Sequence, residues 1–306
     1  SENYATRHVN GTGPYTLVSR EVDSRTVMKL NPTYWGKGQF PLQVTELTYV
    51  PIKSPATRVA ALLSGEIDFL QDVPAQDVAR LKSNANLKVA SGLENRTIFL
   101  GLDVGSAKLR HSSVTDRNPL ADARVREALA LAFDFDWLNR HYFQGQYTRT
   151  RSYFANSAMA ASGKPDAEEM RFLKSLSSPL DPAVFGELPE LPDNPDADAL
   201  RRNLKRAQQL LNEAGWRVDA DGVLKNAQGQ AFRFEVLGDA PAFERLATPW
   251  IHNLARLGIR VRQRMVDPAL YQKRVSTFDY DVVTTVYPMS STPGNELLQM
   301  LGSAAA

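Results

Sequence analysis

The chain has 306 residues, of which 43% are hydrophobic and 23% are charged, and it contains no cysteine. A length of this order allows about two domains with a substantial core. The lack of cysteine excludes a disulfide framework, a cysteine nucleophile and thiolate metal ligands. With 36 basic and 34 acidic residues the net charge is +2, which argues against a dominant phosphate-binding surface.

The first hundred residues carry strand patterns with a helix among them. Asp23 and Ser24 form a turn signal between two alternating runs, which predicts a hairpin. Residues 55–63 have a helical apolar face, and Gly65 follows as a natural end of that helix. The alternating or short apolar runs predict strands over residues 14–20, 25–30, 44–50, 67–70, 87–90 and 97–102. We therefore expect a strand–helix–strand unit in a mixed sheet.

The middle of the chain is less regular. Residues 103–120 are polar, contain Gly and Pro, and predict a linker. Asp122 is a good N-cap for a strong amphipathic helix that we expect to continue to about Arg140. Residues 147–198 are rich in Pro, Ser and Asp, and predict an irregular loop with a short helix over 167–176.

The last third predicts an α/β lobe. Amphipathic helices are expected over 199–214 and 243–257, each followed by a glycine, and a short helix is expected from Pro268. Strand patterns cover 216–234 as a hairpin, 259–266, and 280–287. The strand at 259–266 places three arginines on one face, which favours a solvated sheet edge over a phosphate site; they are Arg260, Arg262 and Arg264.

No pattern of catalytic or metal-binding chemistry stands out. The four histidines are widely separated and have no second ligand type at metal-site spacing. Gly11-Thr-Gly13 lacks the third glycine of a dinucleotide fingerprint and precedes a strand instead of a helix. The chain has no Walker A loop, nucleophile elbow or zinc-protease helix. We therefore predict no catalytic residues, no metal and no cofactor.

Eight segments in chain order resemble the family 5 extracellular solute-binding proteins, the peptide- and nickel-binding receptors of ABC importers. They are NGTGPY at 10–15, NPTYWG at 31–36, TRVAALLSGEID at 57–68, VP with DVARL at 73–81, TIFLGL at 97–102, DARVREAL at 122–129, LLNEAGW at 210–216 and LGIRV at 257–261. Three more segments resemble the oligopeptide-binding, YejA-like branch: FDFDW at 133–137, RSYFANS at 151–157 and STPGNE at 291–296.

The resemblance implies an α/β fold of the periplasmic binding protein type, with two lobes of mixed sheets flanked by helices. It places residues 1–102 in the middle segment of lobe I and residues 103–306 in most of lobe II, with an interlobe crossing at 97–103. Members of the family extend beyond both ends of this chain. The resemblance therefore implies a fragment of a longer receptor, without its signal peptide and incomplete in each lobe.

The resemblance also implies a function. The protein would be the substrate-binding component of an ABC-type importer that captures oligopeptides or peptide-like solutes in the periplasm by interlobe closure. It would deliver them to permease subunits in the inner membrane, as a monomer that binds no nucleic acid. The alternative reading is a ligand-sensing module of a transcription regulator, an arrangement that the family also shows.

The ligand-binding residues that the resemblance implies lie at strand ends. They are Phe99, Gly101, Tyr287, Pro288, Met289 and Ser290. Relatives carry an aspartate for the peptide α-amine where this chain has Ser290, and the nearest acid in the strand is Asp281. A blocked, modified or non-peptide ligand is therefore also compatible with the sequence.

Overall fold

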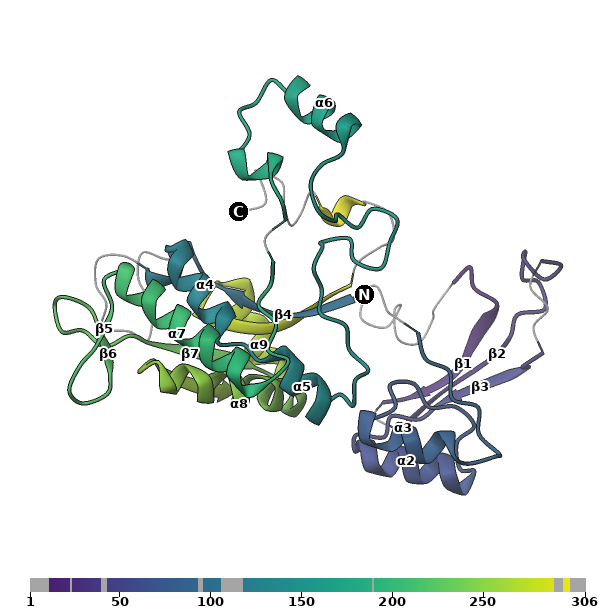
Figure 1. Ribbon diagram of the computed structural model, residues 1–306. Helices are drawn as coiled ribbons and strands as arrows, with labels where there is room; N and C mark the ends of the chain where they lie inside the picture. Colours follow the sequence, from purple (N-terminus) through teal and green to yellow (C-terminus); the bar gives the residue numbers. More distant parts are fainter. Residues whose placement is uncertain are drawn as a thin grey trace. The chain divides into compact units, whose positions relative to one another are not determined.

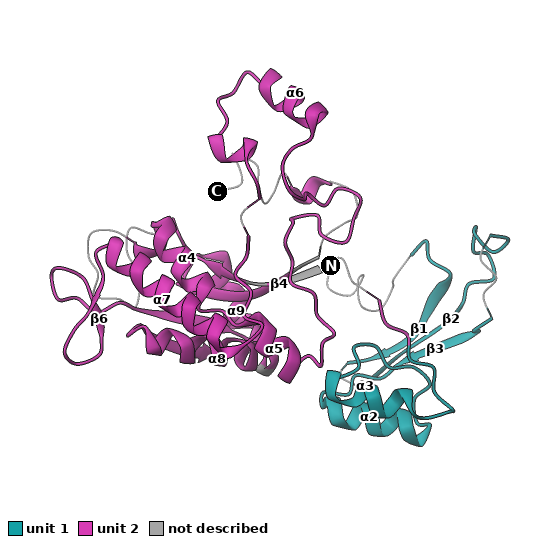
Figure 2. Cartoon of the chain, in the orientation of Figure 1, with its two compact units in different colours: residues 1–89 teal, residues 90–306 magenta. Residues whose placement is uncertain are grey.

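The computed structural model describes residues 11–22, 24–39, 43–92, 96–105, 118–188, 190–288 and 294–297. The chain divides into two compact units, residues 1–89 and 90–306, which we describe separately (Figure 2). The expected boundary at 102/103 concerns the lobes of a complete receptor and stays a prediction. Strand β4, at Arg96–Leu102, pairs within the sheet of the second unit.

The first unit combines an antiparallel sheet with helices α2 and α3 (Figure 1). Its strands pair in sequence order, β1 (Tyr15–Glu21), β2 (Arg25–Leu30) and β3 (Glu46–Tyr49), which confirms the predicted hairpin and third strand. Helix α2 (Pro55–Ser64) begins where the Ser54 side chain accepts the Thr57 amide and ends at Gly65, whose φ of 77° suits glycine. Helix α3 spans Ala75–Lys82.

The strands predicted at 67–70 and 87–90 are wrong, because both segments have irregular backbone. The amides of Glu66 and Ile67 donate back to the carbonyl oxygen of Ala61 at the end of α2, at 2.9 and 3.3 Å. The amide of Leu87 similarly donates to Asn84. Local hydrogen bonds thus use backbone groups at the start of each segment that strand pairing would need. The predicted strand–helix–strand unit is not formed here.

The second unit contains most of the regular structure. Its helices are η1 (Pro119–Ala121), α4 (Ala123–Leu131), α5 (Phe135–His141), α6 (Ala167–Ser175), η2 (Pro182–Phe185), α7 (Ala197–Glu213), α8 (Pro241–Arg256) and α9 (Pro268–Ser276). Its strands after β4 are β5 (Arg217–Val218), β6 (Leu224–Lys225), β7 (Arg233–Gly238), β8 (Arg260–Met265) and β9 (Val282–Pro288). These elements confirm the α/β pattern predicted for the last third of the chain.

The main sheet of the second unit has the strand order β4-β9-β7-β8. Strands β7, β8 and β9 are parallel, whereas β4 is antiparallel to β9. Side chains alternate between the two faces of the sheet. Phe234, Val236 and Val282 pack in the large core with residues of α4, α7 and α8, while Leu237 and Val283 pack against α9. The sheet is therefore covered by helices on both faces.

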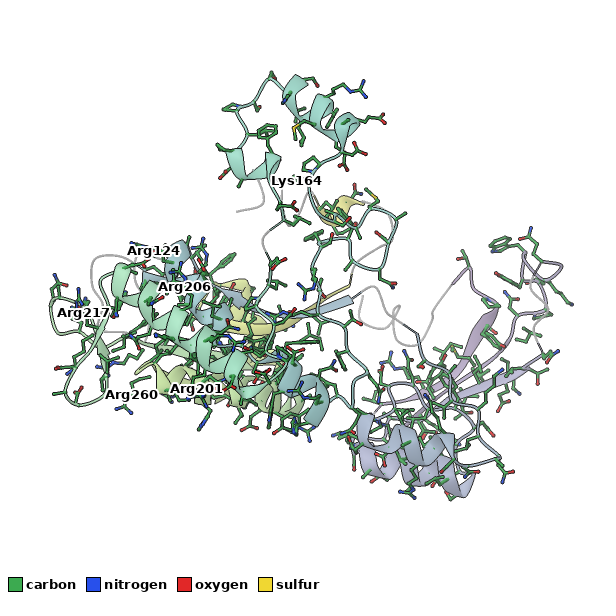
Figure 3. All side chains as sticks on the ribbon, viewed as in Figure 1. Arg124, Lys164, Arg201, Arg206, Arg217 and Arg260 are labelled. Carbon is green, nitrogen blue, oxygen red and sulfur yellow. The ribbon has the colours of Figure 1, made fainter. Side chains whose placement is uncertain are left out.

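Strand β8 lies at the edge of this sheet, and the exposed residues alternate along it as predicted. Figure 3 labels three other arginines of the unit, Arg124 on α4 and Arg201 and Arg206 on α7, each of which has an acidic neighbour. The pairs are Arg124–Asp122 at 2.7 Å, Arg201–Asp198 at 2.8 Å and Arg206–Glu213 at 3.8 Å. Each of these three arginines thus lies beside a carboxylate of the same unit.

The long helix predicted from Asp122 to about Arg140 is wrong in one respect: it is two helices. Asp122 caps α4 as expected, but α4 ends at Leu131 and α5 begins after Asp134. The Asp134 carboxylate accepts the amide of Trp137 at 3.0 Å, and this new N-cap competes with continuation of the first helix. Burial raises the pKa of the Asp134 carboxyl group.

Asp134→Asn should increase the melting temperature at neutral pH. The pKa of Asp134 is higher in the folded chain, so the folded state binds the proton more tightly. The stability gained from that proton is lost as the pH rises through the folded-state pKa. Asparagine keeps the capping oxygen without a charge, so the difference from wild type should shrink as the pH falls to about 4. Thermal unfolding at both pH values measures this.

The control is Asp134→Ala, which removes the cap itself and should cost about 1 kcal/mol at neutral pH. A lower melting temperature for the asparagine variant than for wild type at neutral pH would contradict the interpretation.

Candidate functional site

The β4–β9 pair extends beyond the end of its neighbour β7 (Figure 1). Pairing between β9 and β4 continues to Pro288, which lies opposite Arg96. Pairing between β9 and β7 stops at Val283, which lies opposite Leu237. In the described part of the chain, residues 285–288 therefore pair with a strand on their β4 side alone.

The hydrogen bonds show which backbone groups point to the open side. The amide of Asp103 donates to the carbonyl oxygen of Asp281 at 2.9 Å, so the backbone of Asp281 faces β4. Backbone direction alternates along a strand, so every second residue from 281 to 287 faces β4, and those from 282 to 288 face the β7 side. Val286 thus directs its N–H and C=O to the open side, and Pro288 directs its C=O there.

The described part of the predicted site lies on the antiparallel pair of strands β4 and β9, which we call the β4–β9 ribbon. Phe99 and Gly101 are on β4, opposite Thr285 and Val283, and Tyr287 and Pro288 are on β9, opposite Thr97 and Arg96. Met289 and Ser290 lie outside the described residues. Strand pairing thus brings the segments containing four of the six predicted residues together, and their contact with a ligand stays a prediction.

The β4–β9 ribbon projects from the end of the sheet at which α/β proteins generally bind ligands. The carboxyl ends of β7, β8 and β9 meet there with the beginning of β4, and crevices outside the carboxyl ends of strands are the usual ligand sites of open α/β sheets. An open strand edge can add an extended chain through main-chain hydrogen bonds. Sequence reasoning missed Val286, because a strand pattern does not reveal which side of the strand lacks a neighbour.

A buried ionic network holds α9 against the sheet, level with the beginning of β9. The Glu235 side chain on β7 is fully buried, and its Oε1 lies 2.9 Å from Nη1 of Arg274 on α9. Arg274 also bonds Asp279 through Nε, at 3.1 Å. The guanidinium of Arg262, on the edge strand, lies 3.9 Å from Glu235 Oε2. Charge pairing therefore links α9 to two strands of the sheet.

Asp281, the acid nearest to the predicted site in the strand, has a structural role. It lies just before β9, is 1% exposed, and its Oδ2 accepts the amide of Glu235 at 2.8 Å. This position is at the opposite end of β9 from Pro288. Asp281 therefore fastens the beginning of β9 to β7, at a distance from the predicted ligand-binding residues at the end of this strand.

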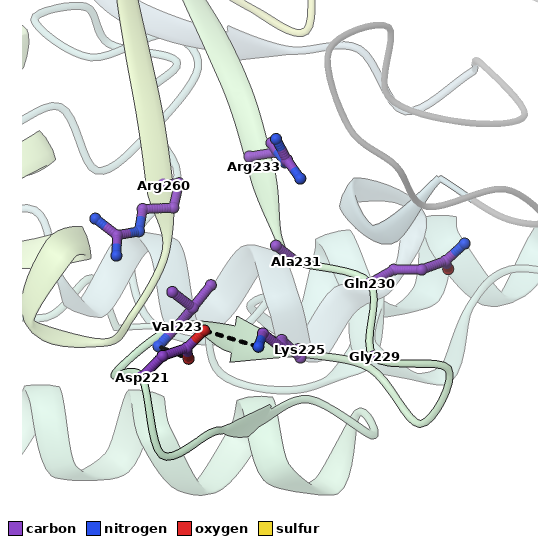
Figure 4. Close-up of a pocket in the computed structure, with 8 residues that line it drawn as sticks. All are labelled: Asp221, Val223, Lys225, Gly229, Gln230, Ala231, Arg233 and Arg260. Atoms are coloured by element: carbon purple, nitrogen blue, oxygen red, sulfur yellow. Dashed lines mark hydrogen bonds and ion pairs between the residues drawn. The ribbon is translucent and has the colours of Figure 1, made fainter.

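A shallow pocket of about 480 Å³ lies at the other end of β7 and β8, beside the β5–β6 hairpin (Figure 4). Arg233 and Arg260, the first residues of these strands, contribute to its wall. The Lys225 ammonium lies 2.9 Å from Asp219 and 2.8 Å from Asp221, and hydrogen bonds to these carboxylates raise its pKa. The acidic turn is thus already paired with a cation of the chain itself.

Two further findings concern the described residues. None of their helices is long and apolar enough to cross a membrane. No group of three or more His, Asp or Glu side chains among them is arranged to hold a metal ion.

Comparison with known proteins identifies the class. All of residues 1–306 match the model of the bacterial extracellular solute-binding proteins, family 5 Middle. The chain belongs to this family, which confirms the resemblance read from its motifs.

Curated relatives agree. The chain is 33% identical to the uncharacterized protein y4wM of Sinorhizobium fredii, over 97% of this chain and 45% of the relative. It is 30% identical to the probable peptide-binding protein YejA of Agrobacterium fabrum, over 97% of this chain and 49% of the relative. The chain thus spans about half the length of these relatives, and the likeness to the YejA-like branch is confirmed.

A solved structure shows the fold. The oligopeptide-binding protein AppA of Bacillus subtilis, in complex with a nonapeptide, aligns with a TM-score of 0.63 and 20% identity. The alignment covers 92% of this chain and 48% of AppA. The predicted fold class, an α/β fold of the two-lobe periplasmic binding protein type, is therefore confirmed.

Arg274→Met should decrease the free energy of unfolding by about 3 kcal/mol, because it leaves the buried Glu235 carboxylate without its closest cation. Urea unfolding followed by circular dichroism measures this loss. Adding Glu235→Gln should restore part of it, because the buried charge is then removed.

Arg264→Met, on the exposed face of β8, is the matched control and should change stability by less than about 0.5 kcal/mol. Equal effects of the two arginine substitutions would show that the network does not hold α9 to the sheet.

Proposed function

We propose that the protein is the substrate-binding component of an ABC-type importer. It captures oligopeptides or peptide-like solutes in the periplasm and delivers them to permease subunits in the inner membrane, as a monomer and without catalysing a reaction. Membership in a family of extracellular solute-binding proteins supports this role and favours it over the sensing module of a transcription regulator. The peptide-binding name of the YejA relative supports the ligand class.

The open side of β9 is the observation that carries the proposal. An extended peptide presents alternating N–H and C=O groups along its edge, which are complementary to those that Val286 and Pro288 direct to the open side. Binding through the main chain does not depend on ligand side chains, so it suits a receptor for peptides of varied sequence. Phe99, Gly101 and Tyr287 on the ribbon, and Met289 and Ser290 after it, would then line the ligand.

Capture of a ligand requires a conformational change of the receptor in addition to a binding surface. We propose that the two lobes of the complete receptor close over the ligand, because a ligand that contacts both lobes stabilises the closed form alone. Closure would remove water from the main-chain hydrogen bonds and strengthen them. The closed receptor would then be the form that the permease recognises.

Isothermal titration calorimetry of the protein expressed from its whole gene tests the ligand class. We expect alanine oligopeptides, from the dipeptide to the hexapeptide, to bind with an optimum length. A length series is informative because the main-chain contacts should saturate once the ligand fills the site. The proposal fails if none of them binds while a sugar or a metal chelate binds tightly.

Val286→Pro tests the binding mode. The Val286 amide points to the open side, so proline removes a donor available to the ligand and leaves the ladder to β4 intact. We expect peptide affinity to fall about tenfold, the value of one main-chain hydrogen bond at a protected site, with little change in melting temperature.

The matched control is Thr285→Pro, whose amide faces β4. It should lower the stability of the protein by about 1–3 kcal/mol through loss of a ladder bond. Unchanged peptide affinity in Val286→Pro would show that the ligand does not pair with this edge.

A further inference from the structure

A hydrogen bond from α9 lies at the beginning of the side of β9 that β7 leaves open. Tyr271 of α9 donates its hydroxyl hydrogen to the main-chain carbonyl oxygen of Thr284, at 2.6 Å, in a buried position. Thr284 directly follows Val283, the last residue of β9 that pairs with β7. By the alternation established above, the backbone of Thr284 faces the β7 side. A side chain of α9 thus supplies a donor at the point where the pairing of β9 with β7 ends.

The Tyr271 side chain is held in one position by its surroundings. Its side chain is almost completely buried, and it packs with Leu237 and Val283 in the smaller core cluster. Helix α9 is held at its beginning by the Asp267 side chain, which accepts two amides of the first turn. Near its end, the Arg274–Glu235 pair ties it to β7. The hydroxyl therefore has a defined position relative to the sheet.

Thr284 is also restrained through its own side chain. Its hydroxyl lies 3.4 Å from the carbonyl oxygen of Leu237, across the end of the β7–β9 pairing. The threonine side chain is 1% exposed, so the contact with Tyr271 lies in a protected environment where hydrogen bonds are strong. The residue is thus anchored to α9 through its backbone and to β7 through its side chain.

We propose that Tyr271 is a positioning residue for the ligand strand, and this inference rests on the peptide-binding role proposed above. By holding the Thr284 carbonyl, it fixes the point at which β9 leaves the sheet. Val286, two residues further along, is then the first residue whose N–H and C=O are both presented to a ligand. Tyr271 touches no ligand and acts through the backbone of β9.

The inference has a consequence for ligand selection. A fixed backbone position at Thr284 sets the register in which a bound peptide pairs with β9. The same ligand amide then donates to the Val286 carbonyl oxygen in every complex. Because the effect operates on the ligand main chain, it should be equal for peptides with different side chains. Loss of the Tyr271 hydroxyl should let the backbone of β9 adopt several positions beyond Thr284. Peptide binding should then be weaker, since pre-organisation of the site lowers the entropic cost of binding.

The test is a double-mutant cycle between Tyr271→Phe and the ligand. The probe is the alanine oligopeptide that wild type binds most tightly, together with analogues in which each amide in turn is replaced by an ester. In wild type, replacement of the amide that meets Val286 should weaken binding about tenfold. Tyr271→Phe should lower the affinity for the parent peptide about three- to tenfold, and it should lower the affinity for that ester analogue much less.

The control is Tyr15→Phe, which also removes a hydrogen bond from a tyrosine hydroxyl to a main-chain carbonyl, that of Val44 at 2.8 Å in the first unit. It should leave peptide affinity unchanged. A general loosening of the fold by Tyr271→Phe would lower the affinity for the parent peptide and for every ester analogue by the same factor. That result would overturn the inference. Unchanged affinity of the parent peptide in Tyr271→Phe would overturn it as well.

The outcomes separate the two proposals. If wild type binds no member of the peptide series, the proposed function fails. If wild type binds peptides and the cycle shows no coupling between Tyr271 and a particular ligand amide, the function stands and the role of Tyr271 fails.

Discussion

The antiparallel pairing of β4 with β9 is the constraint on which the rest of the second unit depends. It joins the first strand of the unit to its last, so the chain between them must form a large closed loop, at an entropic cost that grows slowly with length. The large core of α4, α7 and α8 against the sheet offsets that cost. Once β9 is held on one side by β4 and is left by β7 part of the way along, the direction of its free backbone groups follows from strand geometry.

Helix α9 adds a second constraint at the same place. On its face of the sheet, a small apolar cluster is combined with buried charge: Glu235 and Arg274 pair beside the packing of Tyr271 and Val283. A buried ion pair contributes little net stability compared with apolar packing, but its loss on one side is costly. We therefore interpret the pair as a means of keeping α9 in one position, and the position of α9 decides where the Tyr271 hydroxyl meets β9.

The sequence allowed much of this architecture to be predicted. Strands 97–102, 259–266 and 280–287 follow from apolar alternation, and the helices that end at Gly65 and near Gly215 and Gly258 follow from periodicity and capping. The family resemblance supplied the fold class and named residues on both β4 and β9. None of these signals depends on long-range contacts, since each is carried by residues near in sequence.

The remaining features required tertiary structure. The strand expected at 67–70 was lost to hydrogen bonds with Ala61 at the end of α2, a competition that an apolar pattern does not reveal. The break between α4 and α5 depends on a second N-cap, Asp134, which acts in addition to the predicted N-cap Asp122. The open side of Val286 depends on where β7 ends relative to β9, and Tyr271 reads from sequence as an ordinary apolar position of a short helix.

Proline at position 288 has a consequence for solubility. An exposed strand edge with free N–H and C=O groups can template pairing with the same edge of another molecule, which leads to aggregation. The backbone of Pro288 faces the open side of β9 and lacks an N–H, so this edge offers an incomplete hydrogen-bond ladder to a second copy of itself. Edge-to-edge pairing of two copies through this side of β9 is thereby disfavoured.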